Sequence, residues 1–262
     1  MLSPAACEVD LQASLDTFFE EGYARLGPIL SAEGAAILRS RCDDLMLGKV
    51  RHAGMFFQHD SPTGRYEDLS YGKGWVGPSL AYRKVEGLEL DPVLRQWIEN
   101  ALFRRLTRIA IGEAVQLYRA VLWNKAPNAG TELPWHQDDG RFWGLDRAPF
   151  LQVWTALDDA GPEGACVEVV PGSHVDGLAS PEGGTVMQKD LNARNAEARK
   201  LKLEASAGEG VLLHNHIWHR SGVNRTNQPR RAISISFMSA DTRCIRKRCA
   251  PRTFFQLFAG ED

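Results

Sequence analysis

Short runs of β-forming residues, separated by turn residues, make up the chain from Val115 onward and constrain its fold more than any other feature. The runs read VQLYRAVLWNK, FLQVWTALDD, ACVEVVP, GVLLHNH and RAISISFM, with Gly, Pro, Asn and Asp between them. Several short strands in succession are typical of a sandwich or a closed barrel. We therefore predict a mainly β fold whose core lies in residues 113–240.

Helical patterns precede these strands. Apolar residues recur at helical spacing from Leu11 to Phe19. Ser31 can cap a second helix, and Asp-Pro at positions 91–92 begins a third, whose apolar stripe continues to Gly112. We expect residues 1–112 to form helices and loops that pack on the core.

The whole chain, 1–262, has the length of one large all-β domain. A polar stretch between Ser173 and Gly208 interrupts the strands and has the composition of a lid or substrate loop. The formal net charge of -2 argues against nucleic acid as a partner. A basic tail, 241–262, is most simply a solvated face and otherwise a contact for an anionic substrate or partner. Its basic residues are Arg243, Arg246, Lys247, Arg248 and Arg252.

The cysteines are odd in number and scattered, with no pair at zinc-site spacing. They are Cys7, Cys42, Cys166, Cys244 and Cys249. The N-terminus is acidic where a signal peptide is basic, and no apolar run is long enough to span a membrane. We expect a soluble, cytoplasmic protein, a monomer or homodimer.

Histidine and carboxylate spacing suggests a metal site. An iron that must also bind a cosubstrate and dioxygen needs open coordination positions, which a face of two histidines and one carboxylate provides. His136 and Asp138 in LPWHQDDG are alternate residues, which share a face in an extended segment. His219 in HIWHRSG can supply the distant histidine.

The same spacing occurs elsewhere, so the pattern alone leaves alternatives open. PGSHVDG contains a second His-x-Asp pair, His174 with Asp176, whose simpler interpretation is a polar turn. His214 and His216 compete with His219 as the distant ligand, or else pack at a strand end.

A buried carboxylate of a cosubstrate such as 2-oxoglutarate needs a charged partner, and a guanidinium suits it best. Arg230 begins the strand that contains Ser234 and Ser236, and with a period of two it shares their polar face. Arg231 shares the apolar face instead. The alternative for Arg230 is an exposed arginine at the strand end.

These segments together resemble one family, the phytanoyl-CoA dioxygenase-like Fe(II)/2-oxoglutarate oxygenases. The resemblance covers roughly residues 115–240, through HQD at 136–138, VWTALDDAGPEGACVEVVPGSH at 153–174 and HRSGVNRTNQPRRAISISF at 219–237. It implies a double-stranded β-helix, a jelly roll or cupin-like barrel with flanking helices. It also implies Fe(II), 2-oxoglutarate and dioxygen as the reacting cofactors.

The resemblance implies roles for individual residues. His136, Asp138 and His219 fall on the metal ligands, whereas His174 falls on a turn histidine. Because halogenating relatives replace the carboxylate ligand with a small residue, Asp138 favours oxygenation.

Cosubstrate contacts are implied as well. Arg230 falls on the arginine that binds the cosubstrate carboxylate, and Ser221 and Trp154 fall on other cosubstrate-contacting positions. Lys84 in AYRKVEG matches a family lysine through a looser alignment.

The expected reaction is hydroxylation of an unactivated carbon in a small metabolite or natural-product intermediate; no feature marks a coenzyme A site. The alternatives are desaturation, epoxidation or rearrangement by the same chemistry, a non-oxidative cupin-type metal isomerase or hydrolase, and a binding protein. Candidate substrate contacts suggest a partly apolar substrate with one anionic group. They are Arg141, Phe142, Trp143, Tyr71, Trp75 and Tyr82.

Overall fold

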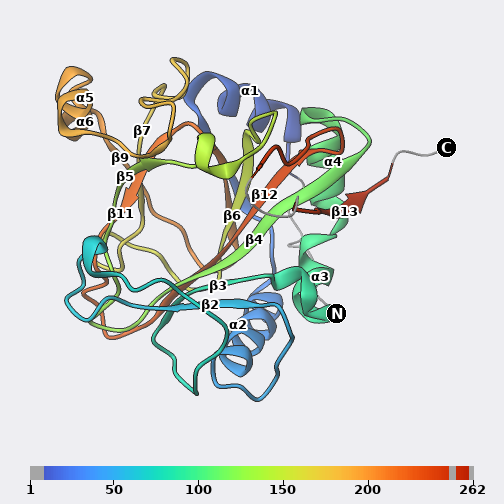
Figure 1. The fold of residues 1–262 in the computed structure, drawn as a ribbon, viewed down its shortest axis with the longest axis vertical. Coiled ribbons are helices and arrows are strands. Elements are labelled where there is room, and N and C mark those ends of the chain that lie inside the picture. The colour runs from blue at the N-terminus through green and yellow to red at the C-terminus, as the bar shows by residue number, and fades with distance from the viewer. Residues whose placement is uncertain (1–8, 248–251, 260–262) are drawn as a thin grey trace.

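The computed structural model describes residues 9–247 and 252–259, which fold into two antiparallel β-sheets flanked by helices (Figure 1). The larger sheet contains, in order, β1 (Tyr23–Pro28), β10 (Glu209–His214), β6 (Leu151–Ala156), β12 (Arg230–Ser239), β4 (Val115–Lys125), β3 (Tyr82–Glu86) and β2 (Phe56–His59), with β13 (Phe255–Phe258) paired to β4. The smaller sheet contains β8 (Gly184–Thr185), β5 (Leu133–Gln137), β11 (Trp218–Ser221), β7 (Val167–Val170) and β9 (Leu201–Leu203). The predicted mainly β jelly roll is confirmed.

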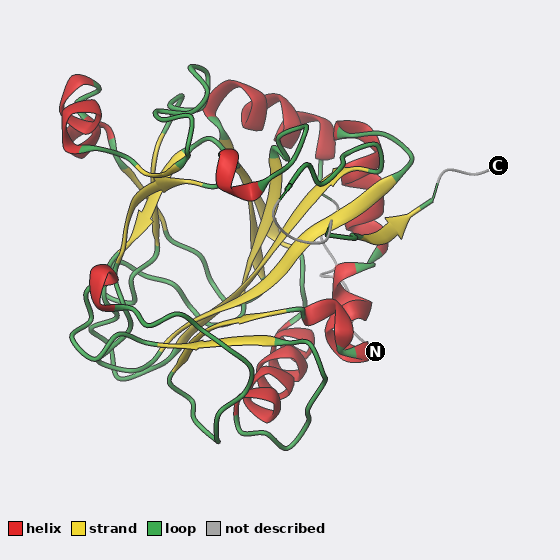
Figure 2. Ribbon diagram, in the orientation of Figure 1, coloured by secondary structure: helices red, strands yellow, loops and turns green. Residues whose placement is uncertain are grey.

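Helices lie on both sides of this β framework (Figure 2). They are α1 (Leu11–Glu21), α2 (Ala32–Met46), α3 (Pro92–Ile98), α4 (Ala101–Ala110), α5 (Gln188–Ala193) and α6 (Ala196–Arg199). Leu15, Leu38 and Phe103 of the first, second and fourth helices join Ile233 and Ile235 of β12 in the largest hydrophobic core. This core lies on the face of the larger sheet that carries the apolar half of the β12 alternation.

The helix starts expected at Ser31 and Asp91 are confirmed, because both side chains cap the first turn of a helix. The single helix expected from Asp91 to Gly112 is wrong. Asn100 interrupts it, and its side chain accepts a hydrogen bond of 3.0 Å from the Phe103 amide to cap α4. An asparagine side chain competes for backbone groups in this way, so it favours a cap over a helix interior.

Residues 1–112 contribute more than the helices and loops expected of them, because β1, β2 and β3 all join the larger sheet. These strands are short and weakly alternating, so pairing with neighbours stabilises them more than local propensity does. The expected tail, 241–262, likewise contains β13, where Phe255 pairs with Leu117. Arg248, Cys7 and Cys249 lie outside the described residues.

The polar stretch from Ser173 to Gly208 is ordered into β8, α5, α6 and β9 rather than being a plain loop. Its strand β8 extends the smaller sheet, with Thr185 paired to His136. Gly183 has φ +71, and a Cβ there would lie 1.6 Å from the Asp139 carbonyl oxygen. Glycine is therefore required where this stretch crosses the segment that follows β5.

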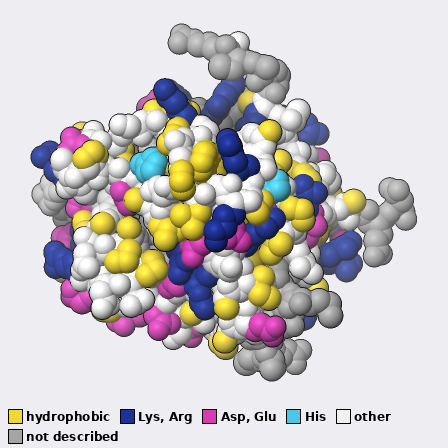
Figure 3. Space-filling model, turned by 90° about the horizontal axis from the view of Figure 1, so that it is seen from below, with side chains coloured by type: hydrophobic (Ala, Val, Ile, Leu, Met, Phe, Trp, Pro, Cys, Tyr) yellow, Lys and Arg dark blue, Asp and Glu magenta, His cyan; other side chains and the backbone are white. Residues whose placement is uncertain are grey.

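In the view from below (Figure 3), Lys and Arg side chains are interspersed with acidic and apolar ones, so the described part of this face is not uniformly basic. Within the described ranges, no helix has the length and apolar character needed to cross a membrane. Cys42, Cys166 and Cys244 have free thiols.

Candidate metal centre

Two adjacent strands of the smaller sheet bring the two predicted histidines together. His136 of β5 and His219 of β11 face each other in the ladder, with ring centroids 4.0 Å apart. Asp138 follows β5, and its Oδ2 lies 3.7 Å from His219 Nε2. Ligand atoms of all three residues lie within 4.8 Å of one another. The backbone ladder thus places a face of two histidines and one carboxylate in the interior.

Hydrogen bonds to the backbone fix which nitrogen of each histidine is available. Nδ1 of His136 lies 2.8 Å from the Pro134 carbonyl, and Nδ1 of His219 lies 3.0 Å from the Ile217 carbonyl. Because carbonyls only accept, both Nδ1 atoms carry the proton and both Nε2 atoms keep a free lone pair. Metal-binding histidines are typically oriented in this way.

Side chains of the larger sheet hold the Asp138 carboxylate from the other side. Arg119 of β4 donates to Oδ1 at 3.0 Å, and Gln152 of β6 donates to Oδ2 at 2.8 Å. Ser234 donates to Gln152 Oε1 at 2.9 Å, which orients that amide with its NH2 group toward Asp138. With both oxygens engaged, the carboxylate has a fixed direction toward the two histidines.

Electrostatics keep His136 and Asp138 in the protonation states that bind a metal. Burial lowers the pKa of His136 to about 3, with repulsion from His219 acting in the same direction. Burial alone would raise the pKa of Asp138, but attraction to Arg119 and to the two histidines brings it below its ordinary value. A neutral His136 imidazole and an ionised Asp138 carboxylate therefore coexist at neutral pH, and a donor set of two histidines and one carboxylate suits Fe(II) with open positions.

Three of the four predicted cosubstrate residues line a chamber at the three metal-binding candidates. This inner chamber is lined by His136, Asp138 and His219 together with, among others, Trp154, Ser221 and Arg230. Arg230 is only 3% exposed and donates from Nη2 to the Ala165 carbonyl at 2.9 Å, and its Nε has no partner among the described residues. A buried guanidinium with unused donors fits the far carboxylate of 2-oxoglutarate.

Lys84 lies elsewhere. Its Nζ pairs with Glu86 Oε1 at 2.6 Å, and it lines an outer cavity of about 640 Å³ rather than the inner chamber. His136 and Asp138 also line this outer cavity, so the two spaces meet at the metal-binding candidates.

The candidate substrate residues divide between the outer cavity and the core. Tyr71, Phe142 and Trp143 line the outer cavity. Tyr82 is buried and donates to the Gly77 carbonyl, and Trp75 donates to the Met46 carbonyl. These two residues have packing roles. The remaining candidate, Arg141, has a side chain 75% exposed, beside Glu182.

The rival histidines form a separate group. His174 approaches the Phe19 carbonyl at 3.0 Å, and its ring centroid lies 4.8 Å from that of His214. His216 pairs with Asp139 at 2.9 Å. None of the three rivals lines the inner chamber.

Among the residues of these spaces that escaped sequence reasoning are Arg83, Arg119, Lys125 and Gln152. The available signal was a charged or amide side chain inside an otherwise apolar strand, since Arg119 interrupts VQLYRAVLWNK and Gln152 interrupts FLQVWTAL. Such a group is costly to bury without a partner, so it marks a polar site.

Replacing Gln152 with leucine is expected to weaken Fe(II) binding by about 10- to 100-fold, because Asp138 loses a hydrogen bond that orients it. Titration of metal-free protein with Fe(II) under anaerobic conditions measures this. Gln116→Leu is the matched control, since the Gln116 amide donates to the carbonyls of Ser239, Ala240 and Thr242 and not to a metal-site residue. Equal Fe(II) affinity in the wild type and the Gln152 variant would contradict the positioning role.

The metal-free protein is expected to lose stability as pH falls from about 6.5 toward 3. Burial lowers the pKa of His214 to about 3, and repulsion from His174 and His216 acts in the same direction. Between about pH 6.5 and 3 the imidazole is therefore protonated in the unfolded chain but neutral in the folded one. By pH 5 this one residue costs at most about 2 kcal/mol of unfolding free energy. Urea unfolding at pH 7 and pH 5 should show a smaller difference for His214→Gln; equal differences would oppose the assignment.

The jelly roll and the His-Asp-His site define a non-haem iron oxygenase. The family described as "Phytanoyl-CoA dioxygenase (PhyH)" matches residues 18–232. The chain belongs to the phytanoyl-CoA dioxygenase family. These findings confirm the class predicted from the sequence, an Fe(II)- and 2-oxoglutarate-dependent dioxygenase.

Individual relatives are distant. Phytanoyl-CoA dioxygenase 1 of Oryza sativa subsp. japonica is 25% identical, over 92% of both proteins. The peroxisomal phytanoyl-CoA dioxygenase of Homo sapiens is 27% identical over 68% of this chain and 56% of that protein. Among solved structures, EctD from S. alaskensis with 2-oxoglutarate and 5-hydroxyectoine has a TM-score of 0.72 at 19% identity, covering 100% of this chain and 92% of that one. The epimerase SnoN in complex with Fe3+, alpha ketoglutarate and nogalamycin RO has a TM-score of 0.71 at 18% identity, covering 94% and 98%.

Proposed function

We propose that this protein hydroxylates an unactivated carbon of a small metabolite or natural-product intermediate, with Fe(II) held by His136, Asp138 and His219 and 2-oxoglutarate held by Arg230. The observation that carries the proposal is the buried Arg230 guanidinium, which lies in the same chamber as the three ligand candidates and whose Nε has no partner in the part of the chain that the structure describes. A sugar-binding or purely structural jelly roll has no use for such a group.

Bound Fe(II) with 2-oxoglutarate supplies the oxidising power, through oxidative decarboxylation of the cosubstrate by dioxygen. The chain's own residues bind and orient the metal and the cosubstrate. His136 and His219 offer Nε2 lone pairs, and Asp138 offers a carboxylate held in place by Arg119 and Gln152. An intact carboxylate at position 138 supports oxygenation rather than halogenation.

Within the inner chamber, Arg230 neutralises the far carboxylate of the cosubstrate. Ser221, 7% exposed, adds a hydroxyl, and Trp154, 4% exposed, adds an apolar wall. Burial strengthens each polar contact, because little water competes for the donors. These residues therefore select and orient the cosubstrate before the substrate arrives.

Lys84 belongs to the same proposal as a cosubstrate contact from the open side of the metal site. Its support is its position in the outer cavity, which His136 and Asp138 also line. Because its ammonium pairs with Glu86, such a contact requires that ion pair to open.

The outer cavity is the proposed substrate site. Its volume of about 640 Å³ lies within the range of small-molecule pockets, and aromatic side chains form much of its wall. Tyr71 and Phe142 are 86% and 57% exposed at its margin, so contact with substrate would cover them. The aromatic part of this wall would help to exclude water from the reacting carbon.

Succinate release tests the proposal. Protein reconstituted with Fe(II), 2-oxoglutarate and ascorbate in air is expected to release succinate slowly without substrate and faster with it. Absence of even slow turnover would favour a binding protein. Activity with zinc or manganese that needs no dioxygen and survives Arg230→Ala would favour a metal isomerase or hydrolase.

A further inference from the structure

Cationic side chains are concentrated around the inner chamber. Arg83, Lys125 and Arg230 are 7%, 6% and 3% exposed, and all three line it. In the part of the chain that the structure describes, none of the three has a carboxylate oxygen within 4.0 Å. A buried cation without an anionic partner is costly, so this arrangement indicates that ligands bring the missing negative charge.

The far carboxylate of 2-oxoglutarate supplies negative charge to two of these cations, Arg230 and Lys125. Arg230 of β12 and Lys125 of β4 are paired residues in the ladder between the two strands. Lys125 Nζ already donates to the Thr131 carbonyl at 2.7 Å and to the Gly222 carbonyl. Both cations therefore face the end of the chamber proposed for the far carboxylate of 2-oxoglutarate.

Arg83 is differently placed, since it lines the outer cavity as well as the inner chamber. Its Nη1 donates to Gln58 Oε1 at 2.7 Å, and its guanidinium lies 5.4 Å from the centroid of the Trp123 ring. Five N–H groups belong to a guanidinium, so one amide acceptor leaves most of its donors unused.

The Asp60 carboxylate acts to raise the pKa of Arg83, but it lies farther from the guanidinium than the 4.0 Å of an ion pair. Asp60 Oδ1 instead accepts hydrogen bonds from the amide and hydroxyl of Thr131, at 2.7 and 2.8 Å. Asp60 thus has a structural role in its loop and leaves Arg83 without a direct anionic partner.

The other cations of the outer cavity are already neutralised. Lys84 pairs with Glu86, and Arg119 pairs with Asp138. Arg83 is therefore the cation of this wall that, among the described residues, lacks an ion pair. Aromatic rings line the same cavity, with the Phe56 and Tyr71 centroids 5.8 Å apart in an edge-to-face arrangement.

We propose that the substrate carries a carboxylate that binds Arg83, attached to a flat apolar body that packs against the aromatic wall of the outer cavity. This inference rests on the proposed function and specifies its substrate class. A carboxylate matches the planar fork of a guanidinium better than a spherical anion does. Arg83 would be a specificity-determining residue, because anchoring the carboxylate at the junction of the two spaces places the adjoining carbons beside the metal site.

Paired probes test this substrate class. Arylalkyl carboxylates such as 3-phenylpropionate and indole-3-propionate, and the primary amide of each, are titrated calorimetrically into anaerobic protein loaded with Fe(II) and 2-oxoglutarate. Wild-type protein is expected to bind the carboxylates at least about tenfold more tightly than the amides. Arg83→Gln should remove that preference, and Arg83→Lys should retain part of it. Arg147→Gln removes an exposed charge that lines neither the inner chamber nor the outer cavity, and should leave the preference unchanged.

The dissociation constant of 2-oxoglutarate is measured in the same variants. Arg83→Gln is expected to change it by less than about threefold. Wild-type protein without a carboxylate preference would overturn the inference, and so would an Arg83→Gln variant that loses 2-oxoglutarate affinity as Arg230→Gln does. In either case, Fe(II)-dependent succinate release by the wild type would leave the proposed function standing; its absence would reject that function separately. The wild-type comparison decides even if Arg83→Gln does not fold.

Discussion

His219→Ala protein is expected to emerge from desalting without iron and to release no succinate from 2-oxoglutarate. The substitution removes one of two Nε2 donors from a site whose geometry the β5–β11 ladder fixes, and among the described residues no fourth metal-binding side chain joins the three. Asp138→Ala should have the same effect. The loss of iron affinity should exceed the roughly 10- to 100-fold decrease that follows removal of a metal ligand's hydrogen-bond partner. Iron content by mass spectrometry, together with succinate release, measures both.

The second His-x-Asp pair supplies the matched control. His174 contacts the Phe19 carbonyl, and Asp176 pairs with Arg194 at the surface. His174→Ala and Asp176→Ala are expected to retain iron at the wild-type level. Iron loss from the His174 variant together with retention in His219→Ala would show that the wrong pair had been assigned.

Arg230→Met should bind 2-oxoglutarate at least about 30-fold more weakly, because loss of a buried charge-assisted contact costs about 2–5 kcal/mol. In the absence of cosubstrate the same variant should be as stable as the wild type or more stable. Burial lowers the pKa of Arg230 to about 10, which reflects the cost of a charge without a carboxylate partner. Calorimetric titration and thermal unfolding of the ligand-free protein give the two readouts.

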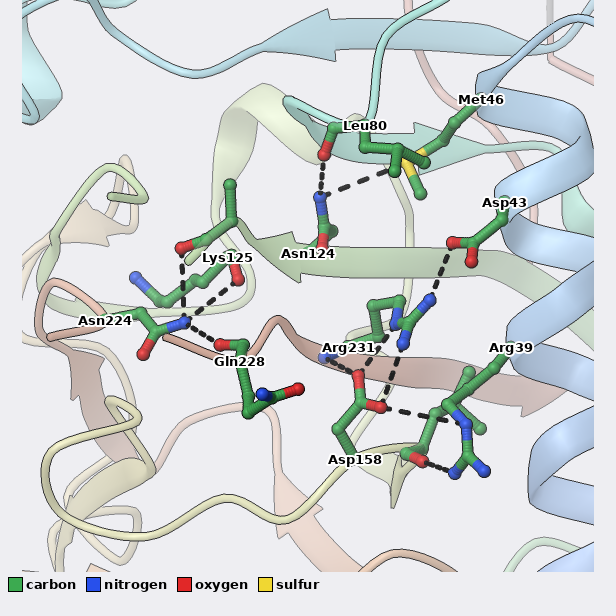
Figure 4. Close-up of polar contacts among 12 residues, drawn as sticks. Arg39, Asp43, Met46, Leu80, Asn124, Lys125, Asp158, Asn224, Gln228 and Arg231 are labelled. Carbon is green, nitrogen blue, oxygen red and sulfur yellow. Dashed lines mark hydrogen bonds and ion pairs between the residues drawn. The ribbon is translucent and has the colours of Figure 1, made fainter. Parts of the chain in front are cut away.

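The next residue along the strand provides an opposite case. Arg231 pairs with Asp158 through two hydrogen bonds of 2.7 and 3.0 Å and with Asp43 of α2 at 2.6 Å (Figure 4). Arg231→Met should therefore lose stability, on the order of 3 kcal/mol, and keep its affinity for 2-oxoglutarate. If the two variants behaved alike, the assignment of Arg230 to the cosubstrate would fail.

This contrast between neighbouring arginines could be predicted from the sequence. Strand alternation separates Arg230 and Ser234 from Arg231 and Ile233, and the structure places the first pair in the inner chamber and Ile233 in the largest core. The strong strand runs were likewise predictable, because long apolar β segments carry their own signal. Local patterns of this kind need no knowledge of distant neighbours.

Features that depend on distant pairing were not predictable in the same way. The strand β3 is short, and its pairing with β4 alone places Arg83 and Lys84 beside Trp123. Asn100 splits a helix through a single side-chain cap. Spacing alone did not distinguish His136 from His174, since both belong to a His-x-Asp pattern, and only the resemblance of the surrounding segments to the family separated them.

The metal-binding residues bridge the two sheets. His136 and His219 belong to the smaller sheet, whereas Asp138 is held by Arg119 and Gln152 of the larger one. An ion bound by all three residues therefore links the two sheets. Because the ion binds only when the sheets are packed together, its binding stabilises the closed barrel. Backbone amides in β5 and β11 should consequently exchange hydrogen more slowly when metal is bound. Local opening of the barrel should therefore become rarer as the fraction of protein with bound iron rises.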